Sequence, residues 1–248
     1  MELRQLIPHA RHVEVPEILT GLQLEERAGP HRPYTIVNFI ASADGRATFR
    51  GRSAPLGDPV DREMFHGLRE QAEAVIAGTH TIRVERYGRL TRDPERQERR
   101  LAAGRQAEPL ACLVTRSGNV PVDAPLFSEP ESRIVVFGPQ GLELRGVEAQ
   151  LEVVRLDPGE LTLTTAMRRL RSEFGIRSLL CEGGPTLFNG LLHEGLVDEM
   201  FLTLAPKLSG GGSAPAITSG PELPELQTLN LIWALEAADS LYLRYRLS

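Results

Sequence analysis

The sequence predicts an α/β fold with a mostly parallel sheet, helices on both faces and an antiparallel C-terminal edge. Short apolar runs alternate with amphipathic segments from residue 34 to residue 194, which is typical of strands joined by helical crossovers. The 248 residues are 41% hydrophobic and 25% charged, which suits a globular protein. We therefore expect a single domain over residues 31–248, preceded by an N-terminal arm over residues 1–30.

Composition and charge exclude several function classes. The net charge of -5 argues against a nucleic-acid-binding protein. No apolar run approaches the ~18 residues of a membrane span, and the first ten residues lack the apolar stretch of a secretory signal. Cys112 and Cys181 each lie in an apolar run, so we expect buried thiols and no disulfide. The six histidines lack metal-ligand spacing, and the expected protein is cytoplasmic and metal-free.

The first elements follow from apolar patterning and capping residues. The arm is weakly patterned, with one short helical turn expected near Pro16–Thr20. Tyr34–Ala41 is almost continuously apolar, as in a strand buried on both faces. A helix follows, with Asp58 as its N-cap and Pro59 in its first turn. Ala74–Ala77 is the next buried strand.

The second half of the chain continues the alternation. Arg92–Glu108 is densely charged and is expected to be a solvated surface helix or a flexible insertion. The last two strands lack a strong helix between them and are expected to form an antiparallel edge pair. The expected strands are Leu110–Thr115, Arg133–Phe137, Leu151–Leu156, Ser178–Cys181, Met200–Ala205 and Leu241–Leu247, and the expected helices are Thr164–Phe174 and Pro185–Glu194.

Residues that can carry chemistry follow the ends of four predicted strands. Open parallel sheets bind ligands at the carboxyl ends of their strands, so we expect these groups to converge on one rim. They are glycines, hydroxyl residues and charged residues: Ser42, Asp44, Gly45 and Arg46; Gly78, Thr79 and Thr81; Arg116, Ser117 and Gly118; and the run Glu182–Thr186.

The run Glu182-Gly183-Gly184-Pro185-Thr186 is the most informative of these groups. Two glycines between a strand and a helix allow backbone N–H groups to approach a phosphate at the helix N-terminus. The alternative is a tight turn that only needs positive φ. The run matches neither G-x-G-x-x-G nor the P-loop pattern. Arg116 and Ser117 are a second candidate anion site, suited to a nucleotide 2′-phosphate, with a plain surface turn as the alternative.

Three segments together resemble a known family. Asn38–Arg46, Leu68–Thr81 and Leu180–Pro206 are similar to the reductase domain of riboflavin biosynthesis, found as the C-terminal half of a bifunctional deaminase-reductase and in stand-alone pyrimidine reductases. The resemblance runs from about residue 34 to the C-terminus. It implies a dihydrofolate-reductase-like three-layer fold, a homodimer, and NADPH-dependent reduction of a ribosylamino-pyrimidine 5′-phosphate to the ribitylamino product. The deaminase motif is missing, so we expect only the reductase step.

The resemblance also implies roles for individual residues. Ser53, Arg69 and Glu182 match substrate-contacting positions, and Glu85 stands where the family usually has Asp. The proton that accompanies hydride transfer to C1′ of the ribose would come from Glu182, Glu85, Asp44 or water. The expected cofactor-binding residues are Ala41, Gly78, Thr79, Thr81, Arg116, Ser117, Gly183, Gly184, Pro185, Thr186 and Leu187.

The sequence departs from the family near Ser53. Pro55 stands where the family often has Trp, and Leu56-Gly57 replaces a Thr-Gly pair. Proline cannot supply the same stacking surface, so the exact substrate stays open. Two alternatives remain: an enzyme of the same fold that reduces another pterin or pyrimidine, and a nucleotide-binding sensor without catalysis.

Overall fold

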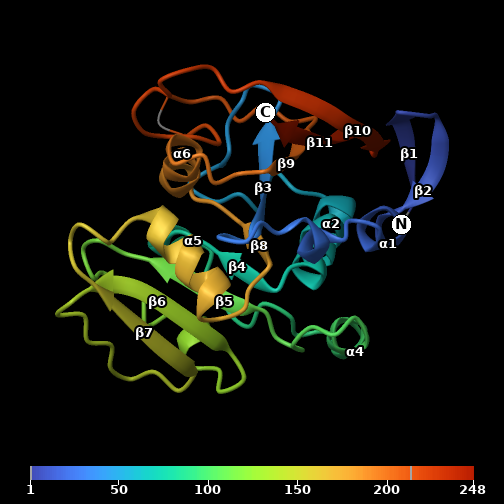
Figure 1. Ribbon diagram of the computed structural model, residues 1–248. Coiled ribbons are helices and arrows are strands. Elements are labelled where there is room, and N and C mark those ends of the chain that lie inside the picture. The colour runs from blue at the N-terminus through green and yellow to red at the C-terminus, as the bar shows by residue number, and fades with distance from the viewer. Residues whose placement is uncertain (1, 213) are drawn as a thin grey trace. The chain divides into compact units, whose positions relative to one another are not determined.

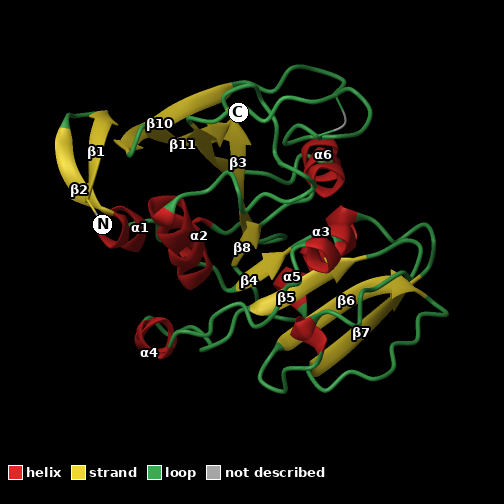
Figure 2. Ribbon diagram, turned by 180° about the vertical axis from the view of Figure 1, so that it is seen from behind, coloured by secondary structure: helices red, strands yellow, loops and turns green. Residues whose placement is uncertain are grey.

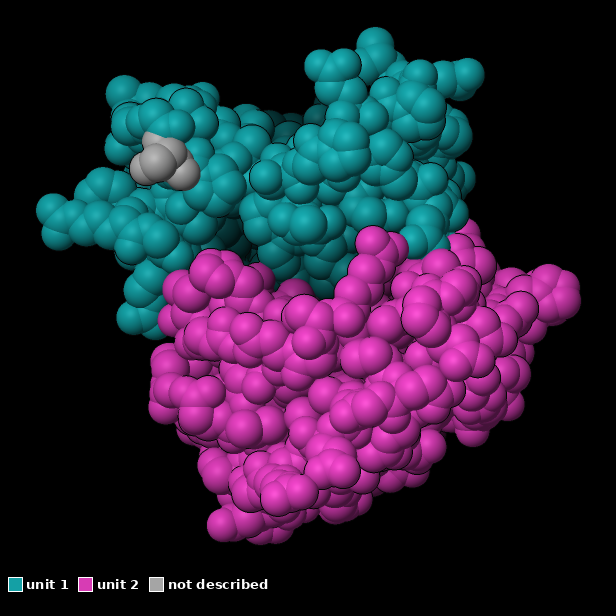
Figure 3. Space-filling view, turned by 90° about the vertical axis from the view of Figure 1, so that its left-hand side faces the viewer, with its two compact units in different colours: residues 1–23, 35–68, 181–248 teal, residues 24–34, 69–180 magenta. Residues whose placement is uncertain are grey.

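A computed structural model of the protein describes residues 2–212 and 214–248 (Figure 1). The chain forms two compact units, which are coloured separately in Figure 3. Unit 1 consists of residues 1–23, 35–68 and 181–248, and unit 2 consists of residues 24–34 and 69–180. The single-domain expectation stays a prediction.

Unit 1 holds a sheet in the order β2-β1-β10-β11-β9-β3. Its strands are β1 (Glu2–Ile7), β2 (Arg11–Glu14), β3 (Tyr34–Ser42), β9 (Glu199–Ala205), β10 (Leu229–Ala237) and β11 (Ser240–Leu247). β3 runs parallel to β9, and the other neighbours pair antiparallel. β9 and β11 pair antiparallel as predicted, but they lie inside this order because β10, β1 and β2 extend the sheet beyond them.

The N-terminal segment is more regular than predicted. Its first residues form the β1–β2 hairpin, whose strand β1 pairs with β10. Leu3 and Gln5 face the interior while their neighbours are exposed, and this alternation on a charged two-stranded ribbon is a weak sequence signal. The predicted helical turn is present as α1 (Val15–Thr20). The other helices of this unit are α6 (Pro185–His193) and most of α2 (Pro59–Gln71).

The start of α2 is capped as the sequence indicates. The Oδ1 atom of Asp58 accepts a hydrogen bond of 2.8 Å from the backbone N–H of Asp61. Asp58 also accepts hydrogen bonds from the hydroxyls of Ser240 and Tyr242 on β11. The cap therefore fixes the beginning of the helix to the C-terminal strand.

Unit 2 is built on a sheet in the order β8-β4-β5-β6-β7. The pairs from β4 to β7 are parallel and in regular register. Its strands are β4 (Ala74–Ile76), β5 (Leu110–Val114), β6 (Arg133–Pro139), β7 (Gln150–Leu156) and β8 (Ser178–Cys181). Its helices are α3 (Thr79–Val84), α4 (Pro94–Ala102) and α5 (Leu163–Ser172), with 3-10 turns η1 (Leu24–Arg27) and η2 (Pro125–Phe127).

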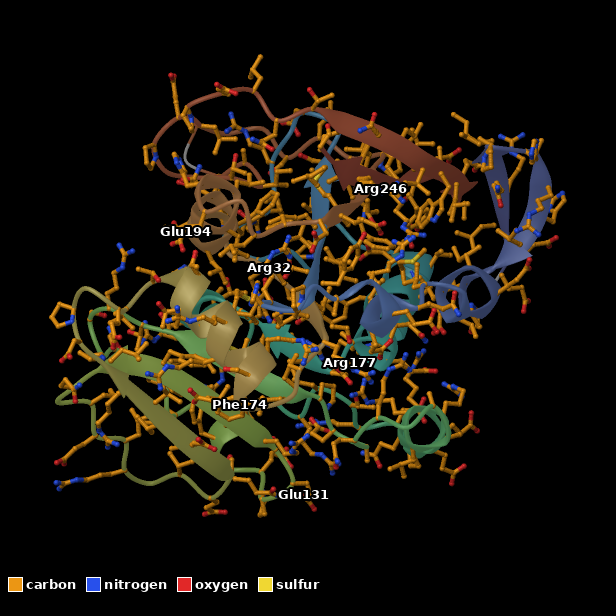
Figure 4. The ribbon with its side chains drawn as sticks, viewed as in Figure 1. Arg32, Glu131, Phe174, Arg177, Glu194 and Arg246 are labelled. Atoms are coloured by element: carbon orange, nitrogen blue, oxygen red, sulfur yellow. The ribbon has the colours of Figure 1, made fainter. Side chains whose placement is uncertain are left out.

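Helices α5 and α3 cover opposite faces of the unit 2 sheet (Figures 1 and 2). Thr162 caps α5 by accepting a hydrogen bond of 3.1 Å from the N–H of Thr165. Phe174, labelled in Figure 4, follows α5 and packs edge-on against Phe137 of β6, with ring centroids 6.3 Å apart. Gly175 then ends this segment at φ +68°.

The charged segment around α4 is not simply a solvated face. Arg100 is completely buried and donates hydrogen bonds from Nη1 to the backbone oxygens of Arg69, Glu70 and Ala72 at the end of α2. Burial lowers the pKa of Arg100 to about 10. The guanidinium supplies hydrogen-bond donors to carbonyl groups at the helix end, which have no N–H donor within the helix. The alternative of a flexible insertion is therefore wrong for α4.

These features confirm the predicted α/β class, with parallel strands, helices and an antiparallel C-terminal part. The antiparallel part is larger than predicted, because it includes β10 and the N-terminal hairpin. Among the described residues, no helix is long and apolar enough to cross a membrane.

Candidate functional site

The connection from β8 to α6 makes a tight turn at Gly183 and Gly184. Gly183 has φ +90°, and the peptide bond between the two glycines is cis. A Cβ atom on Gly183 would lie 3.1 Å from Cε1 of Phe39 on β3, so a side chain at this position would crowd Phe39 and would strain the backbone. Phe39 also packs on Phe188 of α6, with ring centroids 4.9 Å apart. The turn and the start of α6 are thereby fixed against β3.

The N-terminus of α6 presents backbone N–H groups without a side-chain cap. Gly184 is the N-cap residue and Pro185 occupies the first turn. The N–H of Phe188 bonds to the oxygen of Gly184 at 3.0 Å, so Thr186 and Leu187 precede the first intrahelical donor. Such N–H groups and the helix dipole favour an anion. The structure brings the five expected cofactor residues from Gly183 to Leu187 together in this turn.

Glu182 lies just before this turn and is 8% exposed. It follows Cys181, whose thiol pKa is raised to about 12, mainly by complete burial and further by the charge of Glu182. A buried carboxylate must be held by polar partners or a cation, because removing its charge from water is costly. Glu182 is therefore buried at this turn, and its contact with substrate stays a prediction.

Asp44 holds two loops of unit 1 together. Its carboxylate accepts hydrogen bonds from the Ser42 hydroxyl at 2.5 Å and from the backbone N–H groups of Ser209 and Gly210 at 3.0 and 2.8 Å. These bonds lower the pKa of Asp44 to about 2, with the Ser42 hydroxyl as the largest cause. Asp44 is therefore ionised at neutral pH and joins the loop after β3 to the loop after β9.

Two other expected residues of unit 1 lie in different surroundings. Ala41 is buried in β3 opposite Leu204 of β9, so it contributes to the interior of the sheet. Ser53 is half-buried and begins a turn in which its backbone oxygen accepts a 2.9 Å hydrogen bond from the N–H of Leu56. Pro55, which replaces the family's Trp, is exposed in the same turn.

In unit 2, helix α3 carries four of the expected residues. Gly78 is its N-cap, and Thr79 and Thr81 lie in its first turn. Glu85 is the C-cap residue, and its N–H bonds to the oxygen of Thr81 at 2.9 Å. Because the helix has six residues and rises ~1.5 Å per residue, Thr79 and Glu85 lie at opposite ends of it.

The turn after β5 is tied to α3. Arg116 and Ser117 are exposed there, and the Ser117 Oγ atom accepts a 3.3 Å hydrogen bond from the N–H of Asn119. Nη2 of Arg83 on α3 donates to Oδ1 of Asn119 at 2.8 Å. Sequence reasoning missed Arg83 and Asn119, because an Arg–Asn pair 36 residues apart has no sequence signature. The two candidate cofactor groups of unit 2 are thus connected by one side-chain hydrogen bond.

Arg69 is held more firmly than a helix-surface arginine. It is 8% exposed, and its Nη1 donates a 3.1 Å hydrogen bond to the backbone oxygen of Leu90. Its guanidinium lies 5.3 Å from the ring centroid of Tyr87. Arg69 is therefore not a freely solvated helix-surface side chain, and at least one donor of its guanidinium is used within unit 2.

A family model described as RibD C-terminal domain matches residues 33–238. The chain belongs to the RibD C-terminal domain family. The match spans every expected site residue, from Ala41 to Leu187.

Two reductases and one solved structure illustrate what this chain is similar to. The 2,5-diamino-6-ribosylamino-4(3H)-pyrimidinone 5′-phosphate reductase of Archaeoglobus fulgidus is 27% identical over 76% of this chain and 87% of its own length. The reductase of the same name from Methanothermobacter thermautotrophicus is 26% identical over 79% of this chain and 88% of its own length. A pyrimidine reductase-like protein from Corynebacterium diphtheriae shares the fold, with a TM-score of 0.76, 24% identity and coverage of 95% and 99% of the two chains.

Relatives named RibD are longer than this chain. The match to the riboflavin biosynthesis protein RibD of Escherichia coli is 27% identical and covers 79% of this chain but 53% of that protein. The RibD structure of Acinetobacter baumannii has a TM-score of 0.70 at 26% identity and matches 88% of this chain but 59% of that chain. The chain therefore corresponds to about half of these RibD proteins.

Proposed function

We propose that the protein is an NADPH-dependent reductase that converts a ribosylamino-pyrimidine 5′-phosphate to its ribitylamino product in riboflavin biosynthesis. The observation that carries the proposal is the RibD C-terminal domain match over residues 33–238, which spans both groups of candidate site residues. The relatives from Archaeoglobus fulgidus and Methanothermobacter thermautotrophicus, which this chain matches over most of their length, are named as reductases of such a compound.

The residues present fit a nicotinamide dinucleotide phosphate. The uncapped first turn of α6 and the side-chain-free Gly183-Gly184 turn suit a pyrophosphate. The exposed guanidinium and hydroxyl of Arg116 and Ser117 suit a 2′-phosphate, and NADPH is proposed over NADH for that reason. When bound, this cofactor supplies the hydride for C1′ of a ring-opened, imine-like ribose.

The chain's own residues bind and orient the substrate in this proposal. Ser53 and Glu182 contact the substrate, and the guanidinium of Arg69 binds its phosphate. Asp44 does not donate the proton, because its pKa of about 2 leaves it ionised at neutral pH. The proton that accompanies hydride transfer then comes from Glu182, Glu85 or water.

A homodimer and a cytoplasmic location are part of the same proposal. One face of the unit 1 sheet is apolar: Leu231 lies opposite Tyr245, Leu229 opposite Leu247, and Leu243 opposite Leu202. Leu229 and Leu231 are each 39% exposed, so this face suits a second copy of the chain. Sedimentation of the protein and of Leu231→Glu tests the dimer, which the charged variant should dissociate.

The activity is tested by following NADPH absorbance with two substrates, the diamino-pyrimidinone and the aminouracil forms of the ribosylamino 5′-phosphate. Oxidation with either one and a ribitylamino product support the proposal, and dihydrofolate serves as the control. Oxidation with dihydrofolate alone would favour the pterin alternative. Nucleotide binding without oxidation of NADPH by any of the three would favour the sensor alternative.

A further inference from the structure

The protein contains 28 basic residues, of which 27 are arginine and one is lysine. This single lysine, Lys207, follows β9 in unit 1. Its Nζ atom lies 3.0, 2.8 and 3.2 Å from the backbone oxygens of Pro55, Leu56 and Gly57. All three donors of the ammonium are therefore directed at three consecutive carbonyls.

The backbone of Lys207 is itself fixed to the end of the sheet. Its N–H bonds to the oxygen of Ala205, the last residue of β9, at 2.8 Å. Its oxygen accepts a 2.8 Å hydrogen bond from the N–H of Ala43, directly after β3. The ammonium is thus anchored to the ends of two parallel strands and restrains a loop that has little regular structure of its own.

The restrained loop is the one that carries Ser53. Leu56 is buried, and its N–H bonds to the oxygen of Ser53, so the position of Leu56 determines the position of Ser53. A Cβ atom at Gly57 would lie 2.7 Å from Oδ2 of Asp61. The end of the turn from Ser53 to Gly57 therefore lies close to both the Lys207 ammonium and the first turn of α2.

The chemistry of this contact suits the ammonium group of a lysine. An ammonium is compact and has three donors that rotate to meet acceptors around one point. A guanidinium is planar and directs its donors outward in a fixed fork, so an arginine in place of Lys207 would not reproduce all three bonds from the same position.

We propose that Lys207 is a positioning residue, which holds the Ser53 turn in the geometry that binds the pyrimidine substrate. This inference rests on the proposed function, in which Ser53 contacts the substrate. Lys207 itself touches neither substrate nor cofactor in this proposal. Misplacement of a substrate-positioning group by about 1 Å costs on the order of 100-fold in rate.

Kinetics of two variants test the proposal. Lys207→Met has a similar length but no donors, and we expect kcat/KM for the pyrimidine phosphate to fall roughly 10- to 100-fold, with the KM for NADPH almost unchanged. Lys207→Arg should recover only part of the loss, because its fork meets fewer of the carbonyls. The control is Leu208→Ala, the neighbouring residue, whose side chain is 80% exposed and which should behave as the wild type.

A second measurement needs no turnover and is made on the wild-type protein. Reductive dimethylation of the folded wild type modifies Lys207 and the N-terminal amine only, keeps the charge and removes two N–H donors. Hydrogen exchange of the peptide that contains residues 53–57 should become at least about tenfold faster, as its hydrogen-bonded restraint is lost. Lys207→Arg protein treated in the same way is the control, because only its N-terminal amine reacts.

The outcomes separate this inference from the proposed function. Faster exchange together with a selective loss of pyrimidine kcat/KM supports the positioning role. An active wild type whose Lys207→Met variant keeps normal kinetics overturns it, even if the variant melts at a lower temperature. Unchanged exchange after dimethylation overturns it as well. A wild type that reduces no pyrimidine phosphate contradicts the proposed function and, with it, the role of Lys207.

Discussion

The phenolic oxygen of Tyr242 lies 2.9 and 3.0 Å from the two carboxylate oxygens of Asp58. Tyr242 is buried on β11, and Asp58 caps α2. Burial opposes ionisation of Asp58, but bonds from the Asp61 N–H and from the Ser240 and Tyr242 hydroxyls outweigh it and lower the pKa of Asp58. The pair therefore links the last strand to the start of α2 and should contribute to stability.

Tyr242→Phe should destabilise the protein. Removing a hydrogen bond to a charged group costs ~1.5–3 kcal/mol, and each kcal/mol shifts the Tm of a domain of this size by about 2–4 °C. Because the folded pKa of Asp58 is lowered, its stabilisation is present above its unfolded pKa of ~3.9 and is lost as the pH falls through its folded value. The difference in Tm between wild type and variant should thus be largest near pH 7 and shrink below pH ~4. A difference that grows in acid would contradict this account.

Arg116→Ala should weaken NADPH binding and hardly change NADH binding. Loss of a charge-assisted contact costs ~1.5–3 kcal/mol, which corresponds to roughly tenfold to 150-fold in affinity. Titration calorimetry with both nucleotides measures the effect. Arg145→Ala, an exposed arginine paired with Glu143, is the matched control. Equal weakening of NADPH and NADH would remove Arg116 from the 2′-phosphate site.

Glu182→Gln should lower kcat/KM for the pyrimidine phosphate while the Tm and the affinity for NADPH stay nearly unchanged. The reason is that a substrate-binding carboxylate acts only when substrate is present. If Glu182 instead accepts bonds from its own loop, the Tm should fall by several degrees, since ~1 kcal/mol corresponds to about 2–4 °C. Thermal denaturation and kinetics on the same preparation distinguish these results.

Asp44→Asn should leave the shape of the pH–rate profile between pH 5 and pH 8 unchanged. Asp44 has a pKa of about 2 and is already ionised throughout this range, so no limb of the profile belongs to it. An amide can accept at only one of its two terminal atoms, so the bonds from Ser209 and Gly210 cannot both persist. We therefore expect kcat/KM to be lower than that of the wild type by the same factor at every pH. Disappearance of a limb near neutral pH would return Asp44 to the list of proton donors.

Local patterns in the sequence predict the parallel core well. Tyr34–Ala41 and Ser178–Cys181 are mostly apolar runs, and the structure has strands at both places. The same holds for the α6 turn, where Gly-Gly and Pro in the first helical turn are strong local signals. These elements need little information from the rest of the chain.

The missed elements depend on distant partners. β10 has the sequence LNLIWALEA, in which Leu and Ala favour a helix, and pairing with β1 and β11 makes it a strand. Arg100 lies in a charged run, yet three backbone oxygens at the end of α2 bury it completely. For the same reason sequence alone could not find the Arg83–Asn119 bond or the backbone donors of Ser209 and Gly210 that bind Asp44.

The β1–β2 hairpin has a practical consequence for shortened forms of this protein. A chain that began at residue 31, where the sequence suggests that the domain starts, would lose β1, one of the two partners of β10. The backbone N–H and C=O groups of β10 near residues 234–236 would then form an open sheet edge, on the same strand as the exposed Leu229 and Leu231. Such an edge recruits strands from other molecules, so we expect the trimmed protein to aggregate during expression where the full chain stays in solution.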